Sequence, residues 1–185
     1  MTKFSVRLGI VPKIITVACF IIMSFALIKL TQVLFEGGFN IVYLSLIILL
    51  LISIVSPVFT MPVSIYALDD RLLLKKLLGS KTIFYSDIIV AERFYPKSDI
   101  RIFGSGGYWG FFGIFSNPRI GRYTAFVGDY KEAVLIQVAI AGGYKSYVVS
   151  CRNYDEFIML VNNNRDIRTI LSATTATANN YQNEN

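Results

Sequence analysis

The stretch that decides the fold is Ile41-Val-Tyr-Leu-Ser-Leu-Ile-Ile-Leu-Leu-Leu-Ile-Ser-Ile-Val-Ser-Pro57, which contains no charged residue. The uncharged run extends over residues 39–58. About 20 apolar residues are enough to cross the hydrocarbon core of a bilayer. The run therefore predicts a transmembrane helix, which we place at about residues 39–60.

A second apolar run lies just upstream of the first. It is uninterrupted from Ile14 to Ile28 and resumes after Lys29 as far as Phe35, which predicts a helix at about residues 14–35. Glycines follow Glu36 and suit a tight turn, so residues 14–61 read as a transmembrane hairpin. Lys29 lies near the outer end, where its stem reaches the headgroups. The alternative interpretation is a functional intramembrane lysine of an accessory transporter subunit.

The distribution of positive charge predicts the orientation of the hairpin. Short flanks rich in lysine and arginine stay cytoplasmic, and the turn of the hairpin carries only an acid, Glu36. We therefore expect a basic cytoplasmic segment at residues 1–13 and both termini in the cytoplasm. A cleaved signal peptide at residues 1–28 is the alternative, but no small-x-small site precedes a polar start. The flanking cations are Lys3, Arg7 and Lys13 before the hairpin and Arg71, Lys75 and Lys76 after it.

The composition argues against most catalytic classes. The 185 residues are 54% hydrophobic and include no histidine, the commonest general base and metal ligand. The two cysteines are far apart in sequence, so we expect no metal site, no cofactor and no catalytic residue. Turn and helix-terminus roles explain the adjacent acids at 69–70 and 155–156. The net charge of +6 is scattered rather than gathered with aromatics, so we expect no nucleic-acid partner.

Residues 62–171 have the pattern of a small β-rich cytoplasmic domain. Short alternating runs separated by turn residues predict about seven antiparallel strands, in a sandwich or partly open barrel. A helix at 71–78 is the alternative for one run, but eight residues between two turns are few for a helix. The predicted strands are 63–68, 71–78, 82–85, 88–95, 122–127, 132–138 and 144–149.

The C-terminal part of the domain has a different pattern. Asn153 is a suitable N-cap, and Phe157, Leu160 and Val161 share one face, which predicts an amphipathic helix that closes the sheet. The segment 172–185 has no apolar periodicity, and we expect it to be disordered.

The order of elements and several short motifs point to one family. Two apolar helices are followed by Ser64-Ile-Tyr-Ala-Leu-Asp-Asp-Arg-Leu72, by Phe103-Gly-Ser-Gly-Gly-Tyr-Trp-Gly-Phe-Phe-Gly-Ile-Phe115 and by Ile120-Gly-Arg-Tyr123. A strand then runs directly into the last helix at Tyr147-Val-Val-Ser-Cys-Arg-Asn-Tyr-Asp-Glu-Phe157. Over residues 10–165 the chain resembles the bacterial membrane-anchored pleckstrin-homology (PH) domain family.

The resemblance implies an integral protein of the bacterial inner membrane that acts as a binding or scaffolding module rather than as an enzyme. PH domains that bind phosphoinositides place lysines and arginines on the first loop between strands. The corresponding loop here is Leu68-Asp69-Asp70, with Arg71 just after it. We therefore do not expect phosphate to bind at that loop.

The segment 101–122 is the most unusual part of the domain because glycines alternate with aromatic residues and arginines flank them. Three interpretations remain open: a packed core, contact with anionic lipid headgroups, and a groove for a protein partner. Recruitment of a protein partner is the leading hypothesis, and direct sensing of anionic lipid is its rival. The candidate binding residues are Arg101, Gly104, Gly106, Gly107, Tyr108, Trp109, Phe111, Phe112, Arg119 and Arg122.

Overall fold

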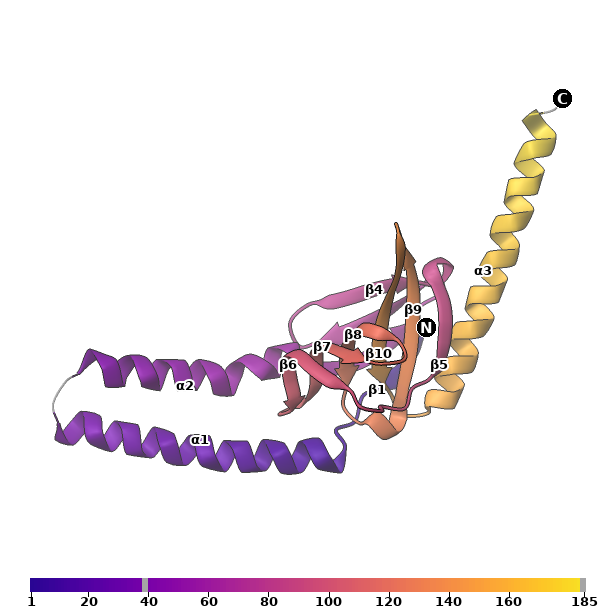
Figure 1. The fold of residues 1–185 in the computed structure, drawn as a ribbon. Helices are drawn as coiled ribbons and strands as arrows, with labels where there is room; N and C mark the ends of the chain where they lie inside the picture. Colours follow the sequence, from indigo (N-terminus) through magenta and orange to yellow (C-terminus); the bar gives the residue numbers. More distant parts are fainter. Residues whose placement is uncertain (38–39, 184–185) are drawn as a thin grey trace.

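Two long helices extend from a β-rich domain in the computed structural model, which describes residues 1–37 and 40–183 (Figure 1). These helices, α1 (Ile10–Glu36) and α2 (Ile41–Thr60), pack against each other. Both are long and apolar enough to cross a membrane, and their most apolar windows are not buried within the protein. Apolar surface of this extent is stable in hydrocarbon rather than in water. The predicted pair of apolar helices is confirmed, and the chain is membrane-anchored.

The helix ends differ from the predicted ones for local reasons. α1 begins before residue 14 because the extended Gly9 caps it, and the Gly9 amide donates to the Gly128 carbonyl at 2.9 Å. Pro12 lies in the first turn of α1, where its missing amide proton is not needed. Pro57 lies inside α2, whose last residue is Thr60.

The first sheet includes a strand from the segment that was predicted only to be a basic N-terminus. This strand, β1 (Thr2–Ser5), pairs antiparallel with β2 (Pro62–Ala67), and Phe4 lies opposite Ile65. The sheet continues through β3 (Arg71–Lys76) and β4 (Ser80–Phe84) in the order β1-β2-β3-β4. A strand of four residues with one inward apolar side chain gives too short a pattern to predict.

The second sheet contains six strands in the order β5-β9-β10-β8-β7-β6. Among the described strands, β8 and β10 form the one parallel pair. Short 3-10 turns at Tyr85–Asp87 and Tyr130–Glu132 precede β5 and β9. The strands are β5 (Ile88–Arg93), β6 (Ile100–Gly107), β7 (Gly110–Asn117), β8 (Gly121–Val127), β9 (Ala133–Ile140) and β10 (Gly143–Ser150).

The predicted fold class, a helical hairpin followed by a mainly antiparallel β domain and a closing helix, is confirmed. Each of the seven predicted strands is present, and the helical alternative for 71–78 is wrong because β3 lies there. The described sheets do not close into a barrel. Three strands were missed, namely β1, β6 and β7. The last two lie in the segment 101–122, where the glycines indicated a loop because glycine weakens strands.

The second sheet is buried on both faces along its central strands. Alternate residues of β9 point to opposite sides, so Ile136 belongs to the core between the two sheets and Leu135 belongs to a second cluster behind. In β10, Val149 likewise belongs to the core between the sheets, and Val148 belongs to the second cluster. This two-sided burial explains why β9 and β10 are nearly continuous apolar runs in the sequence.

The closing helix α3 (Tyr154–Asn183) lies along β5 and then extends beyond the sheets (Figure 1). Phe157 is fully buried in the core, and the Asn162 side-chain amide donates to the Ala91 carbonyl of β5 at 3.2 Å. The structure differs from the expectation of disorder over 172–183, where the helix continues. Extending a helix that packing has already started costs little, and alanine favours it. Residues 184–185 lie outside the described residues.

Candidate functional site

The glycine-aromatic segment is a β-hairpin whose tip reaches the membrane helices. β6 and β7 pair as far as Gly107 and Gly110, so only Tyr108 and Trp109 form the connection. Trp109 has a φ of 58°, in the left-handed region that glycine or asparagine usually occupies in turns. Holding a bulky residue there costs about 1–2 kcal/mol. Contacts of the tip must offset this cost.

Hydrogen bonds connect the tip to both helices. The Tyr108 hydroxyl donates to the Ile54 carbonyl of α2 at 3.2 Å. The Trp109 amide donates to the hydroxyl oxygen of Thr16 in α1 at 2.9 Å. Thr16 donates its own hydroxyl proton to the Pro12 carbonyl at 2.7 Å, so this hydroxyl both accepts and donates. The tip therefore lies between the domain ends of α1 and α2.

Pro57 lies in the part of α2 that the tip contacts. Proline has no amide proton, so Pro57 cannot donate to the Ser53 carbonyl one turn earlier. Ile54, which accepts the Tyr108 hydroxyl proton, directly follows Ser53. The tip thus contacts α2 one residue after the carbonyl that has no helical donor at Pro57.

Two close approaches require the glycines of the hairpin. Gly104 and Gly113 lie opposite each other with φ of 109° and 119°. A Cβ on either would collide with a carbonyl oxygen of the other strand. At the tip, a Cβ on Gly107 would lie 2.6 Å from the Ile15 Cδ1 atom of α1. The glycines let the two strands approach each other and let the tip approach α1.

A cleft of about 750 Å³ lies between this hairpin, the neighbouring sheet surface and the two helices. We call it the junction cleft. Two of its lining side chains are cationic, and the described residues that line it include no acidic one. The lining residues are Ile15, Cys19, Ser56, Pro57, Lys76, Arg101, Phe103, Gly104, Ser105, Gly106, Tyr108, Phe112, Gly113, Thr124 and Phe126.

The two cations of the junction cleft come from different sheets. The Lys76 Nζ atom at the end of β3 lies 4.8 Å from the centre of the Phe126 ring. The Arg101 guanidinium on β6 lies over Gly106, where a Cβ would be 2.8 Å from one of its nitrogens. Within the described part of the chain, neither cation forms an ion pair with a carboxylate. Both charges therefore remain available to an anion.

The structure brings about half of the predicted site residues together. Gly107 and Trp109 lie at the tip rather than in the cleft wall. The predicted residues that line the junction cleft are Arg101, Gly104, Gly106, Tyr108 and Phe112.

Three predicted residues lie elsewhere. The Phe111 ring packs against Tyr130, with ring centroids 4.7 Å apart. Arg119 is exposed and pairs with Glu92 at 3.4 Å, and Arg122 is exposed at the start of β8. Neither arginine lines the junction cleft. They are close to the hairpin in sequence, but β7 separates them from its tip.

Most residues that line the junction cleft were not among the candidates predicted from the sequence. Lys76 was interpreted only as a topological charge, although its place at the end of a strand after the second helix was a usable signal. Ile15, Cys19 and Ser56 belong to uniformly apolar runs in which no position stands out. Their role follows from tertiary contacts alone.

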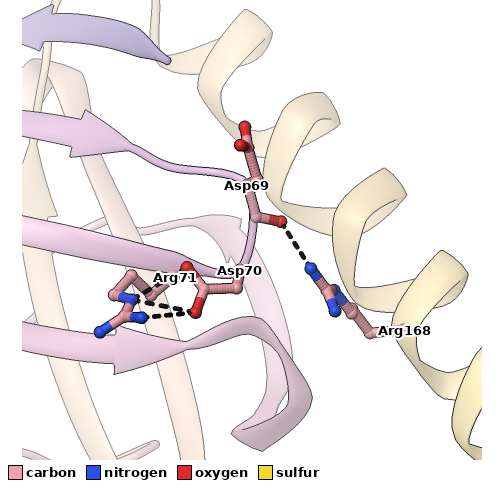
Figure 2. Close-up of polar contacts among 4 residues, drawn as sticks. All are labelled: Asp69, Asp70, Arg71 and Arg168. Atoms are coloured by element: carbon pink, nitrogen blue, oxygen red, sulfur yellow. Dashed lines mark hydrogen bonds and ion pairs between the residues drawn. The ribbon is translucent and has the colours of Figure 1, made fainter.

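The charged and polar groups of the first loop between strands of the domain interact with arginines of the same chain (Figure 2). Arg71 forms an ion pair with Asp70 at 2.7 Å, and the hydrogen bond from Arg71 lowers the pKa of the Asp70 carboxyl. Arg168 of α3 donates to the Asp69 carbonyl at 3.2 Å. Both arginines near this loop therefore have partners. The structure offers no reason to assign phosphate binding to this loop.

The buried titratable groups have structural roles. The Tyr123 hydroxyl donates to Asp99 at 2.6 Å, which attaches the segment before β6 to the sheet. Burial raises the pKa of Tyr123 and raises that of Tyr130 to about 12. Burial also raises the pKa of the Cys151 thiol to about 12, and a thiol of this kind is a poor nucleophile. No cluster of metal-ligating side chains occurs among the described residues.

Comparison with known proteins identifies the β-rich part of the chain. A family model described as a bacterial PH domain matches residues 64–164, which is more than half of the sequence. The match covers the strands from β2 to β10 and the first part of α3, and it confirms the resemblance seen in the motifs. No curated protein and no solved structure matches the chain.

Proposed function

The chain belongs to the bacterial PH-domain family, and we propose that it is a non-catalytic binding module that recruits a protein partner to the cytoplasmic face of a bacterial membrane. The observation that carries the proposal is the insertion of the hairpin tip between α1 and α2 through Tyr108 and Trp109. PH domains are generally binding modules. A domain fixed directly to its membrane helices presents the same surface at a constant height above the bilayer.

Two further contacts support a fixed orientation of the domain. The Leu78 amide, in the turn after β3, donates to the Phe59 carbonyl near the end of α2 at 3.2 Å. The Gly9 amide at the start of α1 donates to the Gly128 carbonyl after β8 at 2.9 Å. Together with the tip, these contacts hold the domain at both helices. A flexible linker would leave the orientation of the domain variable.

The charge pattern and the first sheet support the cytoplasmic assignment. Lysines and arginines flank the hairpin on the domain side, and Glu36 lies at its far end. β1 precedes the hairpin, β2 follows it, and the two strands pair. This pairing supports the proposal that both ends of the hairpin lie on one side of the membrane. We assign that side to the cytoplasm, with two spans between.

The edge strand β6 is the surface that best suits a protein partner. β6 pairs only with β7 in the described sheet, so its other edge is open for an added strand. Its apolar side chains are well exposed, with Ile100 at 68% and Ile102 at 46% of full exposure. Apolar side chains beside an open edge are typical of strand-addition sites.

In-cell photocrosslinking tests the proposal. A photoreactive residue at Ile102 should capture a discrete protein, whereas the same residue at Met159, which is 65% exposed on α3, should not. Trp109 is unsuitable as the probe position because its amide is hydrogen-bonded to Thr16 of α1 and its indole nitrogen is buried. Equal capture from both positions, or from neither, would contradict recruitment at the β6 edge.

Direct sensing of anionic lipid is a second candidate function. Arg101 favours it, because this residue lies in the junction cleft with Lys76. A role as an accessory transporter subunit was considered only because Lys29 lies within a membrane helix. The Lys29 ammonium donates to Gln32 of the same helix at 3.2 Å, and this contact adds no support for transport.

A further inference from the structure

We propose that the junction cleft binds one anionic phospholipid, with its phosphate between Lys76 and Arg101 and an acyl chain along α2. The inference rests on the proposed function only in that the domain is held at a membrane surface. It names a ligand class for a site that is distinct from the first loop between strands. That loop is already occupied by the chain's own ion pair (Figure 2).

The charges of the junction cleft favour an anion. Lys76 and Arg101 converge on it from two different sheets, and its described lining contains no carboxylate to neutralise them. Guanidinium and ammonium groups are the usual ligands of phosphate. The hydroxyls of Ser56 and Thr124 also line the cleft and can donate to phosphate oxygens. A zwitterionic headgroup would bring a cation next to two others, so an anionic headgroup fits better.

The walls of the cleft favour a lipid over a free phosphate. Beyond the two cations, much of the lining is apolar and includes Ile15, Phe112 and Phe126. Ser56 is shared with a second groove of about 540 Å³ on α2, whose other lining residues are Leu51, Ile52, Val55 and Phe59. Residues 51–59 span about 12 Å along the helix axis. An acyl chain in this groove continues from the cleft into the hydrocarbon.

The depth of the cleft matches the headgroup region. Lys76 lies opposite Pro62, the second residue after the end of α2. The adjacent turn exposes Leu77 and Leu78 at 57% and 64%, and Leu78 is hydrogen-bonded to Phe59. Exposed leucines beside the end of a membrane helix are stable where they enter the bilayer surface. The cations therefore lie where lipid phosphates lie.

Lipid binding by the full-length chain in detergent tests the inference. Native mass spectrometry would compare phosphatidylglycerol with phosphatidylcholine added at equal concentration. We expect phosphatidylglycerol to bind with one lipid per chain at low concentration, and phosphatidylcholine to bind more weakly. The variant Lys76→Gln/Arg101→Gln should weaken phosphatidylglycerol binding about 25-fold, because each cation near anionic lipid is worth about fivefold in affinity.

Two matched variants distinguish lipid binding in the junction cleft from nonspecific electrostatic attraction of anionic lipid to the chain. Lys97→Gln/Lys131→Gln removes the same charge from exposed positions outside the cleft and should bind as the native chain does. Lys76→Arg/Arg101→Lys keeps both charges in place and should retain most of the affinity. Equal loss in the Lys97/Lys131 control, or no loss in the Lys76→Gln/Arg101→Gln variant, would overturn the inference.

Two further measurements use the native chain, without substitution of Lys76 or Arg101. Glycerol 3-phosphate, which has the anion without acyl chains, should fail to displace the lipid, and efficient displacement would exclude the acyl groove. A photoactivatable phosphatidylglycerol should label peptides from 51–59 or 101–113 of the native chain, and labelling elsewhere would contradict the site. Failure of these tests leaves partner capture at Ile102 unaffected, so the two proposals fail separately.

Discussion

The ring of Phe4 packs edge-on against the ring of Phe157, with centroids 5.1 Å apart and planes 72° apart. Both side chains are buried, at 4% and 0% of full exposure. One precedes both membrane helices in the sequence and the other belongs to the closing helix. The core of the domain is therefore built from residues on both sides of the hairpin.

Removal of the Phe4 ring should destabilise the whole domain. Phe4→Ala would leave a cavity between the sheets and α3, and we expect it to lower the free energy of unfolding by about 3 kcal/mol. Ser5→Ala, at the exposed neighbouring position, should change it by less than about 0.5 kcal/mol. Thermal unfolding of the full chain in detergent, followed by near-ultraviolet circular dichroism, measures both. Equal effects of the two variants would show that β1 is not part of the core.

A methyl group at the hairpin tip should separate the domain from α1. The Cβ of Gly107→Ala would lie 2.6 Å from Ile15, whereas Gly142→Ala, also at positive φ, has open space around it. Each substitution costs about 1–2 kcal/mol in backbone strain, and only the first adds a collision. We expect faster amide exchange in 100–117 for Gly107→Ala alone. Similar exchange in both variants would rule out a steric contact at the tip.

The hydrogen bond from Tyr108 to α2 should be measurable on its own. Tyr108→Phe removes the hydroxyl that donates to the Ile54 carbonyl and should cost about 1 kcal/mol. Tyr144→Phe is the matched control, because Tyr144 is 56% exposed at the start of β10. Amide exchange of the β6–β7 peptides and thermal unfolding would be compared. A larger effect from Tyr144→Phe would contradict the tip contact.

The domain should lose stability at alkaline pH. Burial raises the pKa of Cys151 to about 12 from 9.0 and that of Tyr85 to about 12 from 10.0. The unfolded chain therefore loses these protons first. Their contribution is complete below about pH 9 and declines as the pH rises toward 12. Unfolding measured from pH 8 to 12 checks this, and Cys151 should resist maleimide at pH 8 unless denaturant is added.

Labelling of introduced cysteines in intact cells should report the membrane orientation. In a Cys19→Ala background, Glu36→Cys at the hairpin turn should react with a membrane-impermeant maleimide added outside. Lys97→Cys in the domain should react only after the membrane is permeabilised. The reverse pattern would place the domain on the outer side and refute the cytoplasmic assignment, while leaving the pairing of β1 with β2 intact.

Local patterns in the sequence were enough to predict most of the fold. The uncharged run at 41–57 predicts a helix because length and hydropathy alone decide it. Alternation predicts β2, because Ile65 and Ala67 on one face of the strand pack inward. β1 was missed because its partner Ile65 lies beyond two helices. β6 and β7 were missed because glycines 104 and 113 indicated a loop. These glycines are suitable in the strands only because the opposite strand approaches them closely.

The candidate site was harder to predict than the fold. Arg101 and Tyr108 stood out because their segment has an unusual composition. Lys76 and Ser56 did not stand out. Lysines are common after a membrane helix, and serine is unremarkable within one. The junction cleft forms where α1, α2, β3, β6, β7 and β8 meet, and none of these segments specifies it alone. Sites assembled from distant segments leave no periodic signal in the sequence.

The pairing of β1 with β2 imposes a parity rule on the membrane anchor. These strands are neighbours about 4.8 Å apart, so the entire helical hairpin serves as the connection of a β-hairpin. Only an even number of membrane crossings brings β2 back to the side of the membrane on which β1 lies. We expect deletion of either helix to separate Phe4 from its core across the bilayer, and cleavage after residue 28 to remove Phe4 altogether. We therefore expect insertion of the hairpin and folding of the domain to depend on each other.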